Sequence, residues 1–516
     1  MRHLALVCVA AVALYLPTVR YGFVQDDRAI IASNPAAHSI PAALRAFDSS
    51  YWPAESGGGL YRPLAVLSYA VDWAVSGGRP GWMHLINAAW HGLATLLVTL
   101  VLSRWLSPLG ALAAGLVFAL HPVHVEGVAS LVGRAELLVA VFMFAAVMAA
   151  RRKRWTLTVA CAALAMLSKE HGVISAVLIL LDDWLESGRG LRYPKAVYAV
   201  LVTVTLAYLG VWLVVGRPEA GDPAAPFFTA TGAARLAIAL PAVARAAGLL
   251  LWPLDLSADY NPQVIPFRMG LSLAALAGAV VLCGVIWLGV WARRRAPAMT
   301  FAAGAAALAY LPTSNLLFPS GVVLAERALY LPVILAAALA GVGIERLAGR
   351  YNVRVAGAIL AVVVAGLAAR SLRRLPAWRD NRAFLLTLLE DHPESSRAHA
   401  SAAAVLAGLG DTAGAAREYA RADSLFKEDP HLAAGRGFFL LTLGDTSVAA
   451  PLVARARALL PAGRVGLRGE FLLAVARGDT ARARAVSDTA LGRYPAERRW
   501  YFVDSQAVIR LLRPAG

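Results

Sequence analysis

Long apolar runs separated by short polar segments fill roughly the first 375 residues of the chain. The runs are continuous rather than alternating, and a chain in hydrocarbon must satisfy its backbone polar groups internally, so the pattern predicts helices. Several runs reach the roughly 20 residues that cross a bilayer. Eleven spans are expected, at about 4–16, 82–103, 108–121, 136–150, 155–168, 171–186, 195–215, 270–291, 298–312, 328–345 and 353–370.

The first of these runs follows Arg2 and His3, as a signal peptide would. A cleaved signal peptide remains the alternative there, but no clean small-residue cleavage site follows, which favours an uncleaved span with a cytoplasmic N-terminus. Residues 21–81 and 216–268 are then the two large extracytoplasmic loops of a membrane domain at 1–375. A surface helix is expected around Pro63–Val75.

A further apolar stretch, 233–252, is expected to lie at the membrane surface. It contains Arg235, Pro241 and Arg245, which suit an interfacial helix. Leaving it out of the count places most of the basic clusters on the cytoplasmic side, as the positive-inside rule requires. Those clusters are Arg151–Arg154, the Arg189/Arg192/Lys195 group, Arg293–Arg295 and Arg346/Arg350/Arg354; the group Arg370/Arg373/Arg374 falls outside and departs from the rule.

Composition supports a membrane protein and argues against nucleic-acid binding. Hydrophobic residues make up 59% of the chain, above the 45–50% usual in soluble domains. The net charge of +17 comes from basic residues at the ends of apolar runs, where anionic lipid explains them. Cys8, Cys161 and Cys283 lie inside apolar stretches without metal-ligand spacing, so neither a disulfide framework nor a zinc site is expected.

A repeat appears in the last part of the chain. The tripeptide Gly-Asp-Thr occurs at Gly410–Thr412, Gly444–Thr446 and Gly478–Thr480, at a spacing of 34 residues (444−410 and 478−444). This period is typical of tetratricopeptide repeats, which are helix–turn–helix units that bind extended peptides in a concave groove. An extracytoplasmic repeat domain is therefore expected at 376–516, with repeats at about 396–430, 431–463 and 464–497.

Two adjacent carboxylates, Asp26 and Asp27, follow the first apolar run in the sequence YGFVQDD. An acid pair at a membrane surface can hold a divalent cation or accept a proton from a substrate. The bland alternative is a solvated helix cap with a charged neighbour, since Asp is a favoured cap. No metal or other cofactor is assigned; if a cation is bound, these two residues would hold it.

Further polar residues lie near ends of spans predicted to face the same side as the acid pair, where charge is costly and marks function by default. They occur in HPVHVEGVASLVGRAE, SKEH and the segment Pro312–Tyr330. The histidines of the first group are equally consistent with a metal site and with a hydrogen-bonded turn, and its arginine could hold a phosphate or pair with a carboxylate or headgroup. The residues are His121, His124, Glu126, Arg134, Glu136, Lys169, Glu170, Glu326, Arg327 and Tyr330.

Acids and cations together at one surface suit a phosphorylated lipid substrate. Cations would hold the phosphate and stabilise it as a leaving group, while an acid activates an acceptor hydroxyl. A transport pathway would instead require charges at the midplane and repeated halves with broken helices.

The order of these motifs resembles a known family, the transmembrane and tetratricopeptide-repeat-containing O-mannosyltransferases. It runs YGFVQDD, YRPL at Tyr61–Leu64, HPVHVEGVASLVGRAE, LSKEHG, NLLFPSG…AERALYLP and then the repeats, and covers essentially the whole chain. The resemblance implies an all-α fold: a polytopic membrane glycosyltransferase of the C-type fold, followed by an α-solenoid. It also implies transfer of a sugar, mannose or another hexose, from a polyprenyl-phosphate donor to Ser/Thr hydroxyls of exported proteins.

By this resemblance Asp26 and Asp27 are catalytic. Arg134, Lys169 and Arg327 are assigned to the donor phosphate, and His121, His124, Glu126, Glu136, Glu170, Glu326 and Tyr330 to support or substrate contact. The resemblance favours a reaction without metal.

The chain has only about three repeats, fewer than the eukaryotic pattern, so its acceptor is left open. Its compact loops and its Ala and Arg content suggest a bacterial inner-membrane protein that uses undecaprenyl phosphate, with site and repeats extracytoplasmic. The alternatives are a transferase of the same fold that modifies lipid or cell-surface polysaccharide, and a non-catalytic membrane scaffold whose repeats bind peptides.

Overall fold

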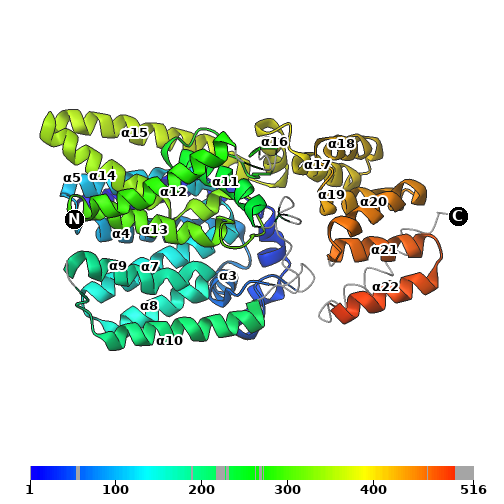
Figure 1. Ribbon diagram of the computed structural model, residues 1–516, viewed down its shortest axis with the longest axis horizontal. Coiled ribbons are helices and arrows are strands. Elements are labelled where there is room, and N and C mark those ends of the chain that lie inside the picture. The colour runs from blue at the N-terminus through cyan, green and yellow to red at the C-terminus, as the bar shows by residue number, and fades with distance from the viewer. Residues whose placement is uncertain are drawn as a thin grey trace.

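The computed structural model is a bundle of apolar helices with a helical solenoid at one end (Figure 1). It describes residues 2–53, 59–187, 190–216, 227, 230, 232–261, 263–266, 270, 272–461 and 463–493. Every regular element within these ranges is a helix, which confirms the predicted all-α class. The last residues of the third predicted repeat, the chain after them and part of the predicted loop 216–268 lie outside the described residues.

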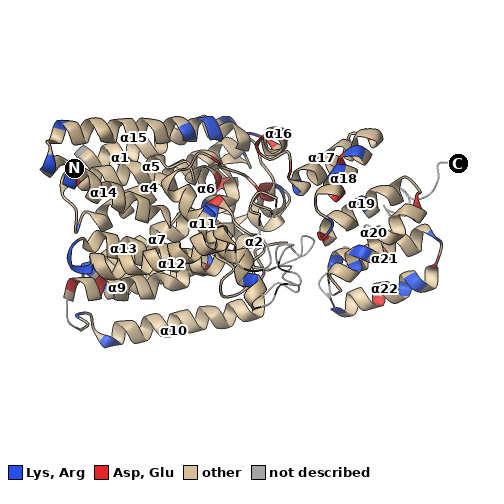
Figure 2. Cartoon of the chain, turned by 45° about the horizontal axis from the view of Figure 1, so that its top comes forward, with Lys and Arg blue, Asp and Glu red and all other residues tan. Residues whose placement is uncertain are grey.

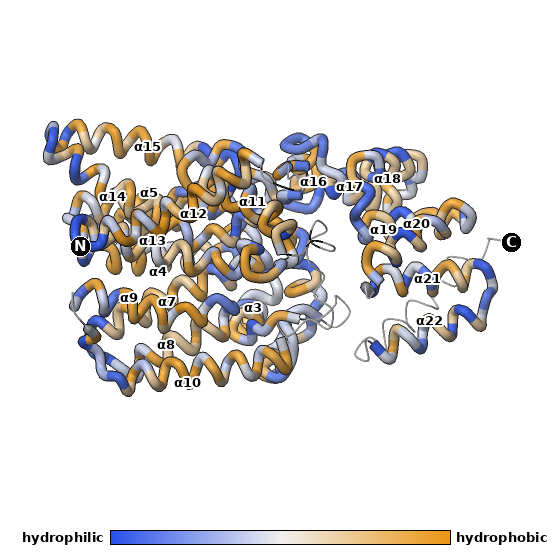
Figure 3. Tube along the Cα trace, viewed as in Figure 1, coloured by the Kyte–Doolittle hydropathy of each residue, from blue (hydrophilic) through white to orange (hydrophobic). Residues whose placement is uncertain are grey.

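Each of the eleven predicted spans corresponds to a helix. Figure 3 shows the helices of the bundle mostly in orange and white, with more blue in the solenoid. The helices are α1 (Arg2–Tyr15), α4 (Pro80–Leu102), α5 (Pro108–Leu120), α7 (Arg134–Arg151), α8 (Trp155–Ser168), α9 (Ser175–Ser187), α10 (Lys195–Val211), α12 (Leu273–Trp291), α13 (Pro297–Tyr310), α14 (Val333–Arg350) and α15 (Val353–Arg374).

Within the described residues, seven helices are long and apolar enough to cross a membrane by themselves. Six of them contain α1, α4, α7, α10, α12 and α15, and the seventh is α11 (Ala233–Leu251). The other five predicted spans are also helices, but they are shorter or carry more charge. The molecule is therefore an integral membrane protein, and the total of eleven crossings stays a prediction.

The two ends of the bundle differ in charge. Figure 2 shows Lys and Arg gathered at the end that carries the N-terminus. Two contacts place three of the predicted cytoplasmic segments together there: Arg151 forms an ion pair with Asp182 at 2.6 Å, and Arg293 lies over the ring of Trp184 at 3.6 Å. This clustering agrees with the predicted orientation of α7, α9 and α12.

Helix α11 meets the length and composition of a span, yet its neighbours favour the predicted surface position. The helix before it, α10, leads to Gly216, whose carbonyl accepts a hydrogen bond from the amide of Leu60 in the first large loop. The helix after it, α12, ends near Arg293 at the opposite end of the bundle. Both flanks of α11 therefore lie at the end of the bundle that faces the solenoid, and we propose that it does not cross.

Short helices cover the solenoid-facing end of the bundle. The loop after α1 contains α2 (Ile40–Arg45) and α3 (Pro63–Ser76), and the latter confirms the helix predicted around Pro63–Val75. A second cover is α6 (His124–Ala129), between α5 and α7, and a third is the 3₁₀ turn η12 (Glu326–Leu329), between α13 and α14. Two of these pieces carry polar residues singled out in the sequence: α6 carries His124 and Glu126, and η12 carries Glu326 and Arg327.

The solenoid consists of three helix pairs at the predicted 34-residue period. They are α17 (Ser396–Gly408) with α18 (Thr412–Leu425), α19 (Pro430–Thr442) with α20 (Thr446–Leu459), and α21 (Arg464–Ala476) with α22 (Thr480–Arg493). A further helix, α16 (Asn381–Asp391), joins the solenoid to α15.

Each Gly-Asp-Thr motif forms the turn inside a pair. Its glycine has a positive φ, for example +84° at Gly410, which ends the first helix without a Cβ clash. Its aspartate caps the second helix, as Asp411 does by accepting a hydrogen bond from the amide of Gly414 at 2.7 Å.

Replacing Gly410 with alanine is expected to destabilise the solenoid by about 1 kcal/mol, because a Cβ is disfavoured at positive φ. Gly408→Ala is the matched control two residues away. It lies at the end of α17, where an added Cβ would meet nothing within 4 Å, so alanine should stabilise by about 0.4–1 kcal/mol. Thermal unfolding of the full-length protein in detergent measures both, and equal effects at the two positions would contradict the role of the motif.

Candidate functional site

The segment Tyr21–Asp27 is fixed from two sides. The amide of Gly22 donates to the carbonyl of Arg379 at 3.0 Å, and the amide of Gln25 donates to the side chain of Asn381 at 2.8 Å. Both acceptors follow the last span, so the beginning and the end of the membrane domain meet beside the solenoid. Gln25 has φ +50°, a strained value for a residue with a side chain, and it directly precedes the acid pair.

Asp27 anchors this segment rather than facing a cavity. It is completely buried. One carboxylate oxygen accepts from the amide of Val24 at 3.0 Å, and the other accepts from the amide of Val132 at 2.9 Å and from the Ser130 hydroxyl at 3.4 Å. Burial raises the pKa of Asp27 to about 7, although the amide donors act to lower it. Asp27 thus holds the loop against the turn before α7.

Asp26, in contrast, is open. Its side chain is 37% exposed and lies 3.6 Å from a guanidinium nitrogen of Arg327, farther than a hydrogen bond. Its carboxylate can therefore still accept a proton from a ligand. Of the two aspartates, Asp26 is the one placed to react.

Arg327 is held in place by Glu126. The Glu126 carboxylate accepts from the backbone amide of Arg327 at 2.9 Å and from its guanidinium at 3.0 Å. Burial raises the pKa of Glu126, and the positive charge of Arg327 opposes that rise. Burial alone would lower the pKa of Arg327, but Glu126 and Asp26 outweigh it, so this guanidinium stays charged.

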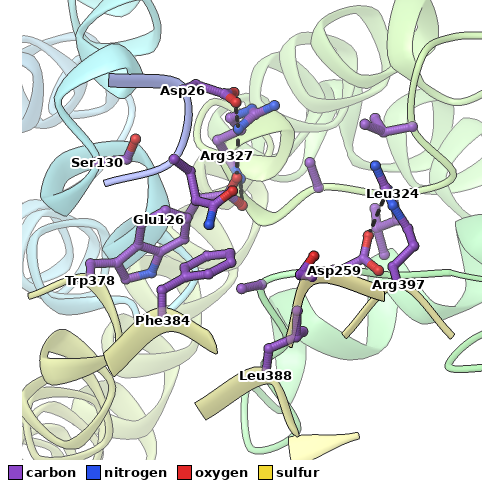
Figure 4. Close-up of a pocket in the computed structure, with 15 residues that line it drawn as sticks. Asp26, Glu126, Ser130, Asp259, Leu324, Arg327, Trp378, Phe384, Leu388 and Arg397 are labelled. Carbon is purple, nitrogen blue, oxygen red and sulfur yellow. Dashed lines mark hydrogen bonds and ion pairs between the residues drawn. The ribbon is translucent and has the colours of Figure 1, made fainter. Parts of the chain in front are cut away.

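Asp26 and Arg327 line two cavities. The first, here called the junction cavity, has a volume of about 170 Å³ and reaches the solenoid. Figure 4 shows Asp26 and Arg327 at one side of it, Asp259 and Arg397 at the other, and the rings of Trp378 and Phe384 along its wall. Charged groups thus lie at both ends of this space, and apolar side chains form part of the wall between them.

The second cavity, here called the basic cavity, has a volume of about 100 Å³ and lies against α3, α7 and the turn after α8. Arg62, Lys169 and Arg327 line it together with Asp26 and Glu136. Lys169 is paired with Glu136, and burial lowers the pKa of Lys169 while Glu136 opposes that fall. Each of these cations already pairs with a carboxylate, but three cationic side chains that face one small space retain further N–H donors for an anion such as a phosphate.

Arg62 was not assigned a role from the sequence. It forms a fork-like pair with Glu170, with three hydrogen bonds of 2.9–3.1 Å, and lies over the ring of Tyr51 at 5.0 Å. It stands in the YRPL motif directly before the proline that starts α3. The sequence around an arginine at the start of a helix does not indicate its partner. For Arg62 the partner is Glu170, 108 residues later, so its role could not be predicted from the sequence.

The prediction that Arg134 contacts the donor phosphate is not supported by its position. Arg134 is completely buried and lines neither cavity. It pairs with Asp72 at 2.5 Å and donates to Asn87 at 2.7 Å and to the carbonyl of Met83 at 3.0 Å. It joins α3, α4 and α7, so its role is structural.

Other predicted site residues also support the fold away from the two cavities. His121 contacts the carbonyl of Leu250 at 3.1 Å, and His124 contacts that of Tyr330 at 3.1 Å. The Tyr330 hydroxyl lies 2.7 Å from Nδ1 of His91. These rings form a packed cluster, which favours the hydrogen-bonded turn over a metal site.

The described residues contain no group of three or more His, Cys, Asp or Glu that could hold a metal ion. Asp26 and Asp27 do not form a shared ligand set either, because both oxygens of Asp27 already accept hydrogen bonds from N–H or O–H groups. The residues present therefore do not fit the cation that the acid pair suggested.

Glu326 is buried and links the site to the loop before α12. Its carboxylate accepts from the amide of Ser257 at 2.6 Å and from the hydroxyl of Tyr260 at 2.8 Å. Burial raises its pKa to about 7, with Arg374 acting in the opposite direction. These hydrogen bonds fix the backbone at Glu326, and with it the position of Arg327, the next residue in the chain.

Stability is expected to fall as the pH rises from about 5 to about 8. The pKa of Asp27 rises from 3.8 to about 7 on folding, so the folded state binds this proton more tightly. Stability from such a group is fully present below the unfolded pKa and is lost as the pH passes the folded one. Thermal unfolding midpoints in detergent across this range measure the effect, and Asp27→Asn should flatten it.

Glu326 shifts in the same direction, so Glu326→Gln should flatten the remaining slope. A midpoint that rises with pH in this range, or one that Asp27→Asn leaves unchanged in slope, would contradict the burial of these protons.

Fold and site together define an integral membrane protein with one charged cavity inside the bundle and a second between the bundle and a helical-repeat solenoid. No family model matches the chain. Curated relatives do match it, and they carry the name of one family.

Protein O-mannosyl-transferase TMTC3 of Mus musculus is 27% identical over 444 residues, which cover 77% of this chain and 48% of that protein. Protein O-mannosyl-transferase TMTC4 of Homo sapiens is 27% identical over 477 residues, covering 77% and 63%. Protein O-mannosyl-transferase Tmtc2 of Drosophila melanogaster is 31% identical over 309 residues, covering 54% and 33%. These relatives confirm the resemblance seen in the motifs, and the chain spans about half the length of the curated relatives it matches.

Among solved structures, the chain is similar to ArnT from Cupriavidus metallidurans, whose crystal structure is bound to undecaprenyl phosphate. The two are 14% identical with a TM-score of 0.35, and the match covers 98% of this chain and 76% of that one. A likeness at this score carries no argument about the site.

Proposed function

We propose that the protein is a membrane glycosyltransferase of the C-type class that moves a hexose, mannose in the first instance, from a polyprenyl-phosphate donor to Ser/Thr hydroxyls of exported proteins. One observation carries the proposal: Asp26 and Arg327 line both the basic cavity and the junction cavity. A transferase needs one point where the donor and the acceptor meet, and these two side chains form it. The names of the relatives give the chemistry of the transferred group.

In this mechanism the basic cavity holds the phosphate of the donor. Arg62, Lys169 and Arg327 surround that position, and their charge stabilises the phosphate as it leaves. The carboxylate of Asp26 takes the proton from the acceptor hydroxyl. The hydroxyl oxygen then bonds to the anomeric carbon, and the bond from that carbon to the phosphate oxygen breaks, so the lipid phosphate leaves with the electron pair.

Charge and topology support an extracytoplasmic site. The basic residues gather at the end of the bundle opposite to the two cavities, and cytoplasmic loops of membrane proteins are enriched in Lys and Arg (Figure 2). We therefore propose that the site and the solenoid lie outside the cytoplasm. The compact loops and the Ala and Arg content support a bacterial inner membrane, with undecaprenyl phosphate as the lipid of the donor.

A lipid or polysaccharide acceptor is the second candidate. The open contact between the junction cavity and the solenoid favours a protein acceptor, because repeat solenoids bind peptides. A scaffold without catalysis would leave unexplained why an open carboxylate and three cations share one space.

The test compares envelope proteins from cells with and without the gene by intact mass spectrometry. We expect one or more proteins to lose the mass of a hexose residue in its absence. Purified full-length protein in detergent, given undecaprenyl-phosphate mannose, should restore that mass. Restoration by a variant that lacks residues 396–516 would show that the acceptor protein binds without the repeats. No hexose change in any protein would overturn protein glycosylation and favour a lipid or polysaccharide acceptor.

A further inference from the structure

A third cavity lies in the first part of the solenoid, between α17, α18 and α19. This repeat groove has a volume of about 230 Å³. Ala400, Ala404 and Gly435 line it, and Tyr419 forms part of its wall. Residues without long side chains leave space in which the backbone of another chain can come close.

The repeat groove adjoins the junction cavity. Arg397 and Ser401, on successive turns of α17, line both spaces. A chain that lies in the groove and continues past these two residues reaches the space that contains Asp26.

Hydrogen bonds hold the groove in register with the site. The segment before α12 meets the start of α17 at three points: Asn261 with Ser395 at 2.5 Å, Gln263 with Ser396 at 3.2 Å, and Asp259 with Arg397 at 2.9 Å. The same segment is bonded to Glu326 through the amide of Ser257. The start of the first repeat is thus linked, through the segment before α12, to Glu326, which is next to Arg327 in the chain. These contacts fix the first repeat relative to the site.

The shape of this path selects the conformation of what can enter it. The junction cavity holds about 170 Å³ and is walled by Trp378, Phe384 and Leu388, so the surface of a folded domain cannot reach Asp26 through it. A single extended strand can, because successive side chains point to opposite sides and the chain is narrow. Small residues on either side of the hydroxyl-bearing one fit best.

Arg397 is suited to position such a strand. Its guanidinium donates to Asp259 through one nitrogen and is 59% exposed, so further N–H groups face the cavities. A guanidinium has five donors, which match the carbonyl oxygens of an extended backbone.

We propose that the repeat groove and the junction cavity form one path for an extended acceptor segment rich in Ser, Thr, Ala and Gly, with Arg397 as its positioning residue. This rests on the function proposed above and names the class of acceptor for the same site. The first two helix pairs of the solenoid, and not its far end, form this path.

The test uses three acceptor probes with the full-length protein and undecaprenyl-phosphate mannose. The first is a linear peptide of about twelve Ala, Gly and Ser residues with one central Thr, about 40 Å long when extended. The second is the same peptide with one cysteine added at each end and the two joined in a disulfide, so that it cannot extend; the linear form with the same cysteines alkylated is its control. The third is a blocked tripeptide with Thr in the middle, which needs only the junction cavity.

The variant is the double change Ala404→Leu/Gly435→Leu, which fills the groove. A Cβ at Gly435 meets only the Tyr419 ring and hydroxyl at 3.7–3.8 Å, so the fold should accept it. The matched control is Ala420→Leu, which is exposed on α18 outside the groove. We expect kcat/KM for the linear peptide to fall about tenfold in the double variant, with transfer to the tripeptide and the behaviour of the control unchanged.

Arg397→Ala is a second variant that leaves the groove open. It should raise KM for the linear peptide more than it lowers kcat, and it should affect the tripeptide less, because the tripeptide can meet Arg397 only in the junction cavity. Equal use of the linear and cyclised peptides, or an unchanged ratio of linear peptide to tripeptide in both variants, would overturn the path while leaving the proposed transferase intact. No transfer to any probe by the wild-type protein would contradict the proposed function itself, and the path with it.

Discussion

Asp26→Asn is expected to lower the rate of sugar transfer by about a hundredfold to ten-thousandfold, the range in which a positioned general base contributes. Asparagine keeps the size of the side chain and its place 3.6 Å from Arg327, but it cannot take the proton of an acceptor hydroxyl. The loss should therefore lie in kcat. Donor binding should change little, because the cations of the basic cavity remain.

Initial rates with saturating undecaprenyl-phosphate mannose measure the first effect, and binding of the labelled donor to the same variant measures the second. Asp255→Asn is the matched control, because Asp255 is 77% exposed and pairs with Arg245 away from both cavities. A variant of Asp26 that kept the wild-type rate would remove the base from the mechanism.

The neighbouring carboxylates are poor substitutes for Asp26. Glu126 accepts two hydrogen bonds from Arg327, and Asp27 accepts from Val24 and Val132. Both are engaged in fixing the loops on which Asp26 and Arg327 lie. The two adjacent aspartates thus divide their roles by environment: one is buried and holds the loop, and the other is open to the substrate.

Much of the architecture could be predicted from the pattern of residues along the chain. Apolar runs locate helices because hydrocarbon leaves few other solutions, and a fixed 34-residue period locates helix pairs because each pair repeats the same turn. Gly410 and Asp411 show why the period can be recognised in the sequence: the turn requires a residue with positive φ followed by a helix cap. Both requirements are local, so the same residue types recur in each repeat.

The partners of the charged side chains could not be predicted in the same way. Arg134 and Arg62 look alike in the sequence, each at the start of a helix, yet one is closed in by Asp72 and the other lines a cavity. The difference depends on residues 62 to 108 positions away. Spacing along one helix contains no information about which other helix lies opposite.

The external cluster Arg370, Arg373 and Arg374 departs from the positive-inside rule for a reason that the sequence did not show. Arg370 donates to the carbonyl of Leu254 at 2.7 Å, and Arg374 is buried and paired with Asp391. The charge of Arg374 also acts on Glu326. Arg370 and Arg374 thus form contacts that join α15 to α16 and to the loop before α12, beside the proposed path of the acceptor.

Arg134→Ala is expected to destabilise the protein by about 3–5 kcal/mol, the cost of removing one partner of a buried ion pair. The change leaves Asp72 buried without its counter-charge and leaves the side chain of Asn87 and the carbonyl of Met83 without a donor. Thermal unfolding in detergent measures the loss. Arg79→Ala, an exposed arginine one residue before α4, is the matched control and should change stability little.

The double variant Arg134→Met/Asp72→Leu separates a structural role from a phosphate-binding one. Replacing both charges by apolar residues removes the unpaired Asp72, so part of the lost stability should return, and with it the transfer activity of the folded fraction. If Arg134 held the donor phosphate, the double variant would stay inactive however well it folded, and Arg134→Ala would raise KM for the donor at unchanged stability. Because Arg134 lines neither cavity, the first outcome is the one that the geometry requires.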